Sequence, residues 1–320
     1  MNQTIWNYLP KAEPELLELA EQMADRDMKE TSSLIKESLE VCRSSVKFAL
    51  PVNGKIINDG LRGLPDGFRL PYPSISIEYA VDDTDEGINI VPVTNTATKR
   101  LVLVRELAIT AATDNGNLNL WLDAIRRRAP AECSHVFIVS GFCELAVGGG
   151  ERKWTPLWCH GMIYNVRKAG SDNFYGTAVP SPCELGLHIA QRIGDEGKDV
   201  QEYAHQDIAH EVQAVLELCE ALACSNVRAD RMPAPLKLNA KRLKAGKPAL
   251  PDYHVLTIST HHGQDEKATR AAIGDRRAPR QHLRRGHVRI YKSGMRIWIN
   301  SMVVGCAANG VIGKEYRVTA

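Results

Sequence analysis

The densest group of side chains that could act on a ligand lies near the C-terminus, between Arg280 and Gly305. Guanidinium groups bind phosphates, imidazoles titrate near neutral pH, and aromatic rings stack on nucleic-acid bases. All three kinds of group occur in this stretch. The side chains that we expect to contact nucleic acid here are Arg280, Arg284, Arg285, Arg289, Tyr291, Arg296 and Trp298.

Two segments of this stretch alternate with period two, His287 to Tyr291 and Arg296 to Asn300, with a Ser-Gly pair between them. The pattern predicts a β-hairpin, and a two-residue loop would place Lys292 opposite Met295. Cations would then lie beside rings on one face, although the alternative is a buried Trp298 covered by an arginine. The expected pairs are Ile290 with Ile297 and Val288 with Ile299 on one face, and Tyr291 with Arg296, Arg289 with Trp298 and His287 with Asn300 on the other.

The same stretch also allows an enzyme. In a metal-independent endoribonuclease, His282 and His287 would serve as general base and acid, while the arginines would stabilise charge developing on the phosphate. The residue types that this chemistry needs are present. The two histidines could converge only if the chain bends between them.

A second basic patch lies in the passage from Asn226 to Pro251, which is rich in Pro, Ala and Lys and has the composition of a linker. From Lys237 to Lys247 its cations recur without an intervening acidic residue, which favours a surface for an anionic partner. The cations of this patch are Lys237, Lys241, Arg242, Lys244 and Lys247, and Lys241, Arg242 and Lys244 are candidate contacts to nucleic acid.

Charge is distributed unevenly along the 320 residues, although the net charge is only +2. Residues 228–320 hold 19 Lys and Arg against 6 Asp and Glu, whereas residues 1–227 hold 21 against 32. Such asymmetry fits a basic region that faces nucleic acid. It fits equally well contact between the acidic and the basic region, or a protein with two docking surfaces, such as an inhibitor of a host defence complex. A homo-oligomer also stays open.

Period and composition predict an α+β fold whose elements would position these residues. We expect N-terminal helices within residues 13–48, a mostly antiparallel sheet over 70–180 and a long amphipathic helix over 200–224 with Asp199 as N-cap. A small C-terminal β unit follows. These elements suggest an acidic domain of residues 1–227 and a basic region of residues 228–320.

Metal and thiol chemistry have little support in the sequence. His205, Asp207, His210 and Glu211 lie close together on the long helix, but the two histidines point in different directions, so we expect a solvated polar face and no metal. We also expect no cofactor, because Walker, dinucleotide-binding, G-x-S-x-G and H-E-x-x-H motifs are absent. The acidic residues at 82–86 are expected to form a turn between strands and not a Mg²⁺ site. The eight cysteines look like buried thiols, and Cys143 and Cys159 are the two to examine for reactivity.

No apolar run is long enough to cross a bilayer, and the N-terminus lacks the basic and apolar regions of a signal peptide. We therefore expect a cytoplasmic protein with no membrane partner.

Several segments resemble conserved hypothetical proteins of phages and prophages. The most distinctive is the C-terminal tail, which carries Arg-Arg-Gly-His at residues 284–287 and continues through Gly294, Trp298 and Val303-Val304-Gly305. The segments at 68–80 and 238–256 are similar as well. The resemblance implies a mobile-element accessory protein inside a bacterial host and no particular chemistry. Combined with the basic C-terminal region, it leads us to expect nucleic-acid binding, to RNA or single strands, with the ribonuclease and the host-protein inhibitor as alternatives.

Overall fold

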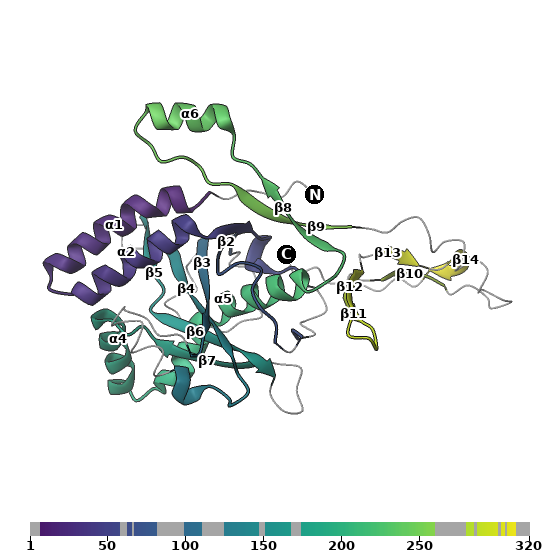
Figure 1. The fold of residues 1–320 in the computed structure, drawn as a ribbon, viewed down its shortest axis with the longest axis horizontal. Coiled ribbons are helices and arrows are strands. Elements are labelled where there is room, and N and C mark those ends of the chain that lie inside the picture. Colours follow the sequence, from purple (N-terminus) through teal and green to yellow (C-terminus); the bar gives the residue numbers. More distant parts are fainter. Residues whose placement is uncertain are drawn as a thin grey trace.

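A mixed β-sheet with helices on both faces forms the body of the molecule (Figure 1). One face packs against the helix pair α1 and α2, and the opposite face packs against the long helix α5. This arrangement confirms the expected α+β fold. The computed structural model describes residues 7–57, 63–65, 67–81, 99–110, 125–146, 151–167, 174–259, 280–284, 287–299, 302–304 and 306–311.

The N-terminal helices are α1 (Leu9–Asp25) and α2 (Lys29–Ser44). The expected helical region ran on to residue 48, and this was wrong, because strand β1 (Val46–Ala49) begins right after α2. The buried Lys47 ammonium donates to the carbonyl oxygens of Cys42 at 2.8 Å, Arg43 at 3.1 Å and Ser45 at 3.0 Å. A cation on the last carbonyls of a helix stabilises its C-terminus, so the helix ends there.

The first turn of α1 is fixed by a carboxylate from the sheet. Buried Glu78 accepts hydrogen bonds from the amide groups of Tyr8 at 2.8 Å and Leu9 at 3.1 Å. Burial raises the pKa of Glu78, although these backbone donors act in the opposite direction. A negative charge at a helix N-terminus satisfies amides that have no partner within the helix. Glu78 and Lys47 therefore fasten the helix pair to the sheet at opposite helix ends.

The sheet order is β7-β6-β4-β3-β2-β1-β9-β8, and β5 also pairs with β4. Strands from β2 to β7 pair antiparallel, as expected for residues 70–180, whereas β1 runs parallel to both of its neighbours. The strands are β2 (Ser74–Ala80), β3 (Lys99–Ala108), β4 (His135–Ala146), β5 (Arg152–Pro156), β6 (Cys159–Arg167), β7 (Phe174–Pro180), β8 (Val227–Met232) and β9 (Tyr253–Ile258).

Helix α5 (Val200–Leu222) begins where the sequence predicted, because the Asp199 side chain accepts from the amide groups of Gln201 and Glu202. Its buried face includes Asp207 and Glu211. The expected solvated polar face was therefore wrong for these two side chains. Two short elements that the sequence did not predict are α4 (Glu184–Asp195) and the 3-10 turn η1 (Val52–Gly54).

The passage expected to be a linker is an ordered arm. Strands β8 and β9 pair antiparallel at the edge of the main sheet, and α6 (Leu236–Lys244) connects them. Figure 1 shows α6 standing away from the body at the end of this ribbon. The linker expectation was wrong because every residue of β8 has a partner in β9. The main sheet thus extends past residue 227, where the sequence suggested a domain boundary.

A small β unit lies beyond the main sheet at the right of Figure 1. Its strands are β10 (Arg280–Arg284), β11 (His287–Ile290), β12 (Arg296–Ile299), β13 (Met302–Val304) and β14 (Cys306–Val311). The acidic turn at 82–86 and the end of the chain lie outside the described residues. Within the described ranges, no helix has the length and apolar character needed to cross a membrane.

Candidate nucleic-acid interface

The C-terminal hairpin forms, but its register differs by one residue from the prediction. His287 lies opposite Ile299 and Val288 opposite Trp298. Gly294 has φ +82°, and the Tyr291 amide donates to the Met295 carbonyl oxygen at 2.9 Å. The loop therefore has three residues with glycine in the left-handed region, a common alternative to the two-residue loop. The predicted pairing was wrong for this reason.

The new register turns Trp298 away from the basic face. Trp298 is half-buried and packs with buried Val288 against an apolar cluster that includes Val227. The Asn226 side chain fixes it there, since it accepts from the Trp298 amide at 2.8 Å and donates to the Trp298 carbonyl oxygen at 2.9 Å. This indole is thus part of the contact between the hairpin and the body.

The candidate cations of the hairpin separate into two environments. Arg296 is buried, and its guanidinium donates to the carbonyl oxygen of Gly63, so it holds a loop and does not face solvent. Arg289 is exposed, and its guanidinium lies 5.9 Å from the ring centre of exposed Tyr291. The structure therefore brings Arg289 and Tyr291 together and separates Arg296 and Trp298 from them.

The two candidate histidines belong to different sheets. His287 lies on β11 and is half-buried, whereas His282 lies on β10, which pairs with β13 and β14. The predicted general acid and base are thus not brought together within one sheet. The side chains of Arg280, His282, Arg284 and Arg285 lie outside the described part of the chain.

The arm that carries α6 is held together by its own polar side chains. The Asn239 amide accepts from the Leu250 amide group at 2.7 Å and donates to the Leu250 carbonyl oxygen at 3.0 Å. Arg242 donates to the carbonyl oxygen of Pro248 at 2.8 Å. Both side chains therefore face the returning segment and fix one side of α6 against it.

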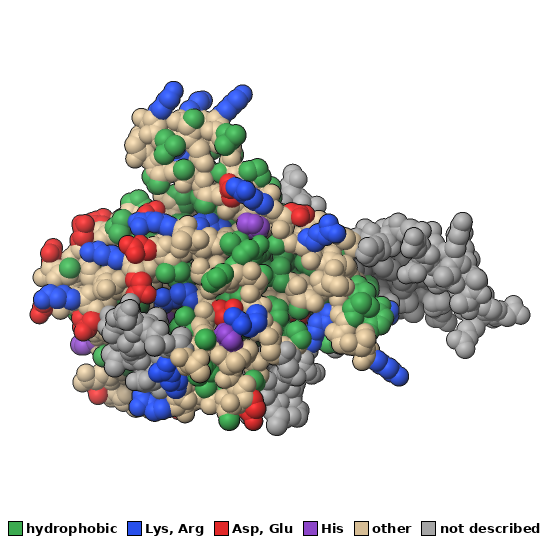
Figure 2. Space-filling model, viewed as in Figure 1, with side chains coloured by type: hydrophobic (Ala, Val, Ile, Leu, Met, Phe, Trp, Pro, Cys, Tyr) green, Lys and Arg blue, Asp and Glu red, His purple; other side chains and the backbone are tan. Residues whose placement is uncertain are grey.

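The opposite side of α6 carries three lysines. Lys237, Lys241 and Lys244 follow one another at spacings of four and three residues, so they form one stripe. All three are exposed, and the arm between Met232 and Pro251 contains no Asp or Glu. Figure 2 shows cationic side chains projecting from the outer side of the arm. At the base of the arm, Asp252 is paired with Arg231, and none of the three lysines forms an ion pair with a carboxylate of the described residues.

Leucines flank this lysine stripe, although α6 has no buried residue. Leu236 is 84% exposed and Leu243 is 63% exposed. They lie on one side of the helix because they are seven residues apart. Neither of them was singled out from the sequence, because the passage was expected to be a linker and not a helix.

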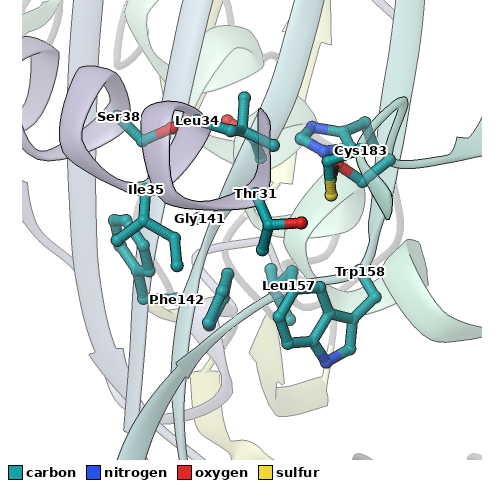
Figure 3. Close-up of a pocket in the computed structure, with 13 residues that line it drawn as sticks. Thr31, Leu34, Ile35, Ser38, Gly141, Phe142, Leu157, Trp158 and Cys183 are labelled. Atoms are coloured by element: carbon teal, nitrogen blue, oxygen red, sulfur yellow. Dashed lines mark hydrogen bonds between the residues drawn. The ribbon is translucent and has the colours of Figure 1, made fainter. Parts of the chain in front are cut away.

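One small cavity lies between the start of α2, strand β4 and the loop before β6, and Figure 3 shows Thr31, Leu34 and Cys183 around it. Its volume is about 10 Å³, which is enough for one water molecule and too small for a substrate. Ser140 and buried His160 also line it. Burial, assisted by Arg105, lowers the pKa of His160 to about 3. This histidine is neutral at physiological pH.

The other concentration of ionisable groups is buried under α5. The Arg100 guanidinium lies 2.8 Å from the Glu211 carboxylate, and both side chains are almost fully buried. Burial, with the charge of Glu211, raises the pKa of Asp207 to about 6. Burial also raises the pKa values of Cys143 and Cys159, so neither thiol is activated. In the described part of the chain no group of side chains has the arrangement of a metal site.

Exposed, unpaired cations thus gather on the α6 arm, and a second, smaller group lies at the tip of the hairpin. Comparisons of the chain with protein-family models, curated proteins and solved structures found no match.

Proposed function

We propose that the protein binds nucleic acid through the α6 arm. The observation that carries this proposal is the stripe of Lys237, Lys241 and Lys244 on the side of α6 opposite its attachment. An exposed stripe of cations, with no carboxylate beside it, suits a polymer with regularly spaced phosphates. Arg289 and Tyr291 at the hairpin tip offer a second place for phosphate and base contacts.

The three lysines of the arm set the smallest salt dependence that the proposal expects. Each phosphate neutralised by a lysine releases condensed counterions, so affinity falls linearly on a log scale with salt concentration. Three such contacts correspond to a slope of about −2 to −3. The resemblance to phage and prophage proteins supports a place of action in the cytoplasm of a bacterial host, where nucleic acid is abundant.

The test uses the full chain with Lys237, Lys241 and Lys244 all changed to Ala, and measures oligonucleotide binding by fluorescence anisotropy. The matched control changes Lys29, Lys153 and Lys198 to Ala. These lysines are also exposed, but each lies beside a carboxylate, at 3.1, 3.7 and 2.7 Å respectively. Both variants lose three positive charges, so a difference between them reports the arm and not the net charge.

We expect the arm variant to bind the oligonucleotide at least about tenfold more weakly, because each lost lysine contact weakens binding by up to about 1 kcal/mol. The affinity of the control variant should stay within about twofold of that of the original chain. Binding that neither variant changes, or binding that salt leaves untouched, would overturn the proposal. A nuclease-resistant protein captured by the original chain and lost by the arm variant would instead point to an acidic protein partner.

A further inference from the structure

The arm exposes leucines as well as lysines, and the lysines alone do not indicate which kind of ligand would contact the leucines. Leu236 and Leu243 lie on one side of the lysine stripe, about a quarter-turn away, and Leu238 lies on the other side. Single exposed leucines are ordinary, but three of them on one short helix form a group, and exposed apolar groups rimmed by polar side chains are typical of binding surfaces. The arm therefore presents cations at its apex with apolar side chains along both edges.

A nucleic acid with both phosphates and base faces accessible matches this arrangement. In a duplex the base faces are stacked on one another, and only the base edges and the backbone remain available. In a single strand the bases can unstack and lie against apolar or aromatic side chains. We propose that the arm prefers single-stranded nucleic acid, with phosphates on the lysine stripe and unstacked bases against Leu236 and Leu243. This inference rests on the proposed function.

The same geometry makes the binding insensitive to base sequence. Asn239 and Arg242 are the side chains of α6 best able to read base edges, because they offer fixed hydrogen-bond donors and acceptors. Both are engaged with the backbone of the returning segment, at Leu250 and Pro248. Apolar contact with a base face does not distinguish strongly between bases.

Other occupants fit the arm less well. A helix that lies on a lipid surface places its apolar stripe at the centre of the contact and its cations at the edges. On α6 the lysines are opposite the attached side, and the leucines are at the edges. A second arm would bring two lysine stripes of like charge close together, which opposes pairing.

The test compares a single-stranded oligo-dT of about 20 nucleotides with a duplex of the same length. One variant carries Leu236→Ser and Leu243→Ser, and a second carries the three Lys→Ala changes. The control is Leu187→Ser on α4, since Leu187 is also a strongly exposed leucine, at 61%. None of these side chains is buried, so thermal unfolding should show an intact body for every variant.

We expect the original chain to bind oligo-dT at least about fivefold more tightly than the duplex, and the leucine variant to lose that preference while keeping its duplex affinity. The lysine variant should bind both ligands more weakly, and Leu187→Ser should bind both normally. Equal binding of the two ligands by the original chain, or equal losses of both in the leucine variant, would overturn the preference but not the proposed function. A leucine variant that changes only the sedimentation coefficient would assign the leucines to a second copy. No binding by the original chain would overturn both proposals.

Discussion

At the scale of single residues, the most unusual groups are charged side chains inside the body. Arg100 and Glu211 form an ion pair of 2.8 Å that water does not reach, and Asp207 lies within range of both. Taking two charges out of water costs several kcal/mol for each, and their attraction offsets this cost only when both are present. The pair therefore specifies how α5 sits on β3 more than it adds stability.

Removing one partner of this pair should lower the free energy of unfolding far more than removing both. We expect Glu211→Gln to lower the free energy of unfolding by about 3 to 5 kcal/mol, because it leaves the Arg100 guanidinium buried without its carboxylate. The double variant Arg100→Met and Glu211→Leu should recover most of that loss. Urea unfolding followed by circular dichroism measures both. A single variant as stable as the original chain would show that the pair is not buried in solution.

The buried imidazole of His160 should make stability depend on pH. Its pKa is about 3 in the folded chain against an ordinary value of 6.5, so between these values the unfolded chain binds a proton that the folded chain excludes. Stability is therefore complete above about pH 6.5 and falls as pH decreases, by about 1.4 kcal/mol per pH unit within the window. Asp207, whose pKa is raised to about 6, acts in the opposite direction, since the folded chain binds its proton first.

A variant of His160 distinguishes its contribution to the pH dependence of stability from that of Asp207. In the His160→Gln variant the residue cannot titrate. Between pH 7 and pH 5 its free energy of unfolding should therefore fall by about 2 kcal/mol less than that of the original chain. Urea unfolding at the two pH values gives this difference independently of any constant cost of the substitution. Equal losses in the two proteins would mean that His160 is hydrated in the folded state.

At the scale of elements, side chains that lie outside a helix or hairpin decide where it begins or ends and how it docks. Lys47 ends α2, Glu78 begins α1, and Asn226 joins the hairpin to the corner between α5 and β8. Each of them satisfies backbone groups that the element itself leaves without a partner. The hairpin depends most on such a contact, because a two-stranded ribbon is only marginally stable alone.

We expect Asn226→Ala to loosen the hairpin without unfolding the body. It removes both the acceptor for the Trp298 amide and the donor to the Trp298 carbonyl oxygen. Hydrogen exchange should accelerate within residues 287–299 by roughly tenfold and stay unchanged in β3 and β4. Asn226→Asp keeps the acceptor and should give an intermediate rate. Uniform acceleration through the whole chain would show that hairpin and body unfold together.

At the scale of the whole molecule, the arm lies outside the core of the body. The core lies between the two faces of the sheet and the helices packed on them, and no residue of α6 contributes to it. The basic charge of the C-terminal part is partly carried on this arm, away from the acidic N-terminal helices (Figure 2). Such a separation keeps the cations from being neutralised by the chain's own carboxylates.

The arm should therefore be removable. Met232 lies opposite Tyr253 in the β8–β9 ladder, so residues 233–252 can be replaced by Asn-Gly, which closes an antiparallel pair with a two-residue loop. We expect the melting temperature to change by no more than about 2 to 4 °C, since no buried residue of α6 is lost. Nucleic-acid affinity should fall as it does in the triple-lysine variant. A shortened chain that fails to fold would show that the arm stabilises the sheet edge.

The sequence by itself determined the classes of element, because hydrophobic period and capping act within a few residues. It gave the α+β class, the antiparallel strands between residues 70 and 180 and the start of α5 at Asp199, which its local N-cap defines. It also identified the lysines of the arm as a basic patch, since charge is visible without a fold.

Only the tertiary structure decided where side chains point and which of them remain accessible. The hairpin register depended on Gly294 adopting a left-handed conformation, and one residue of shift moved Trp298 to the opposite face. Asp207 and Glu211 look like surface groups until Arg100 from β3 supplies a buried partner. Leu236 and Leu243 lie in a passage with the composition of a linker, and only the structure shows them exposed on a helix that extends from the body. The Arg100–Glu211 pair joins residues far apart in sequence, and the exposure of the leucines depends on contacts that α6 does not make, so local pattern contains neither. The loop of the hairpin is local, but its sequence allows loops of two or three residues, and only the structure shows which one forms.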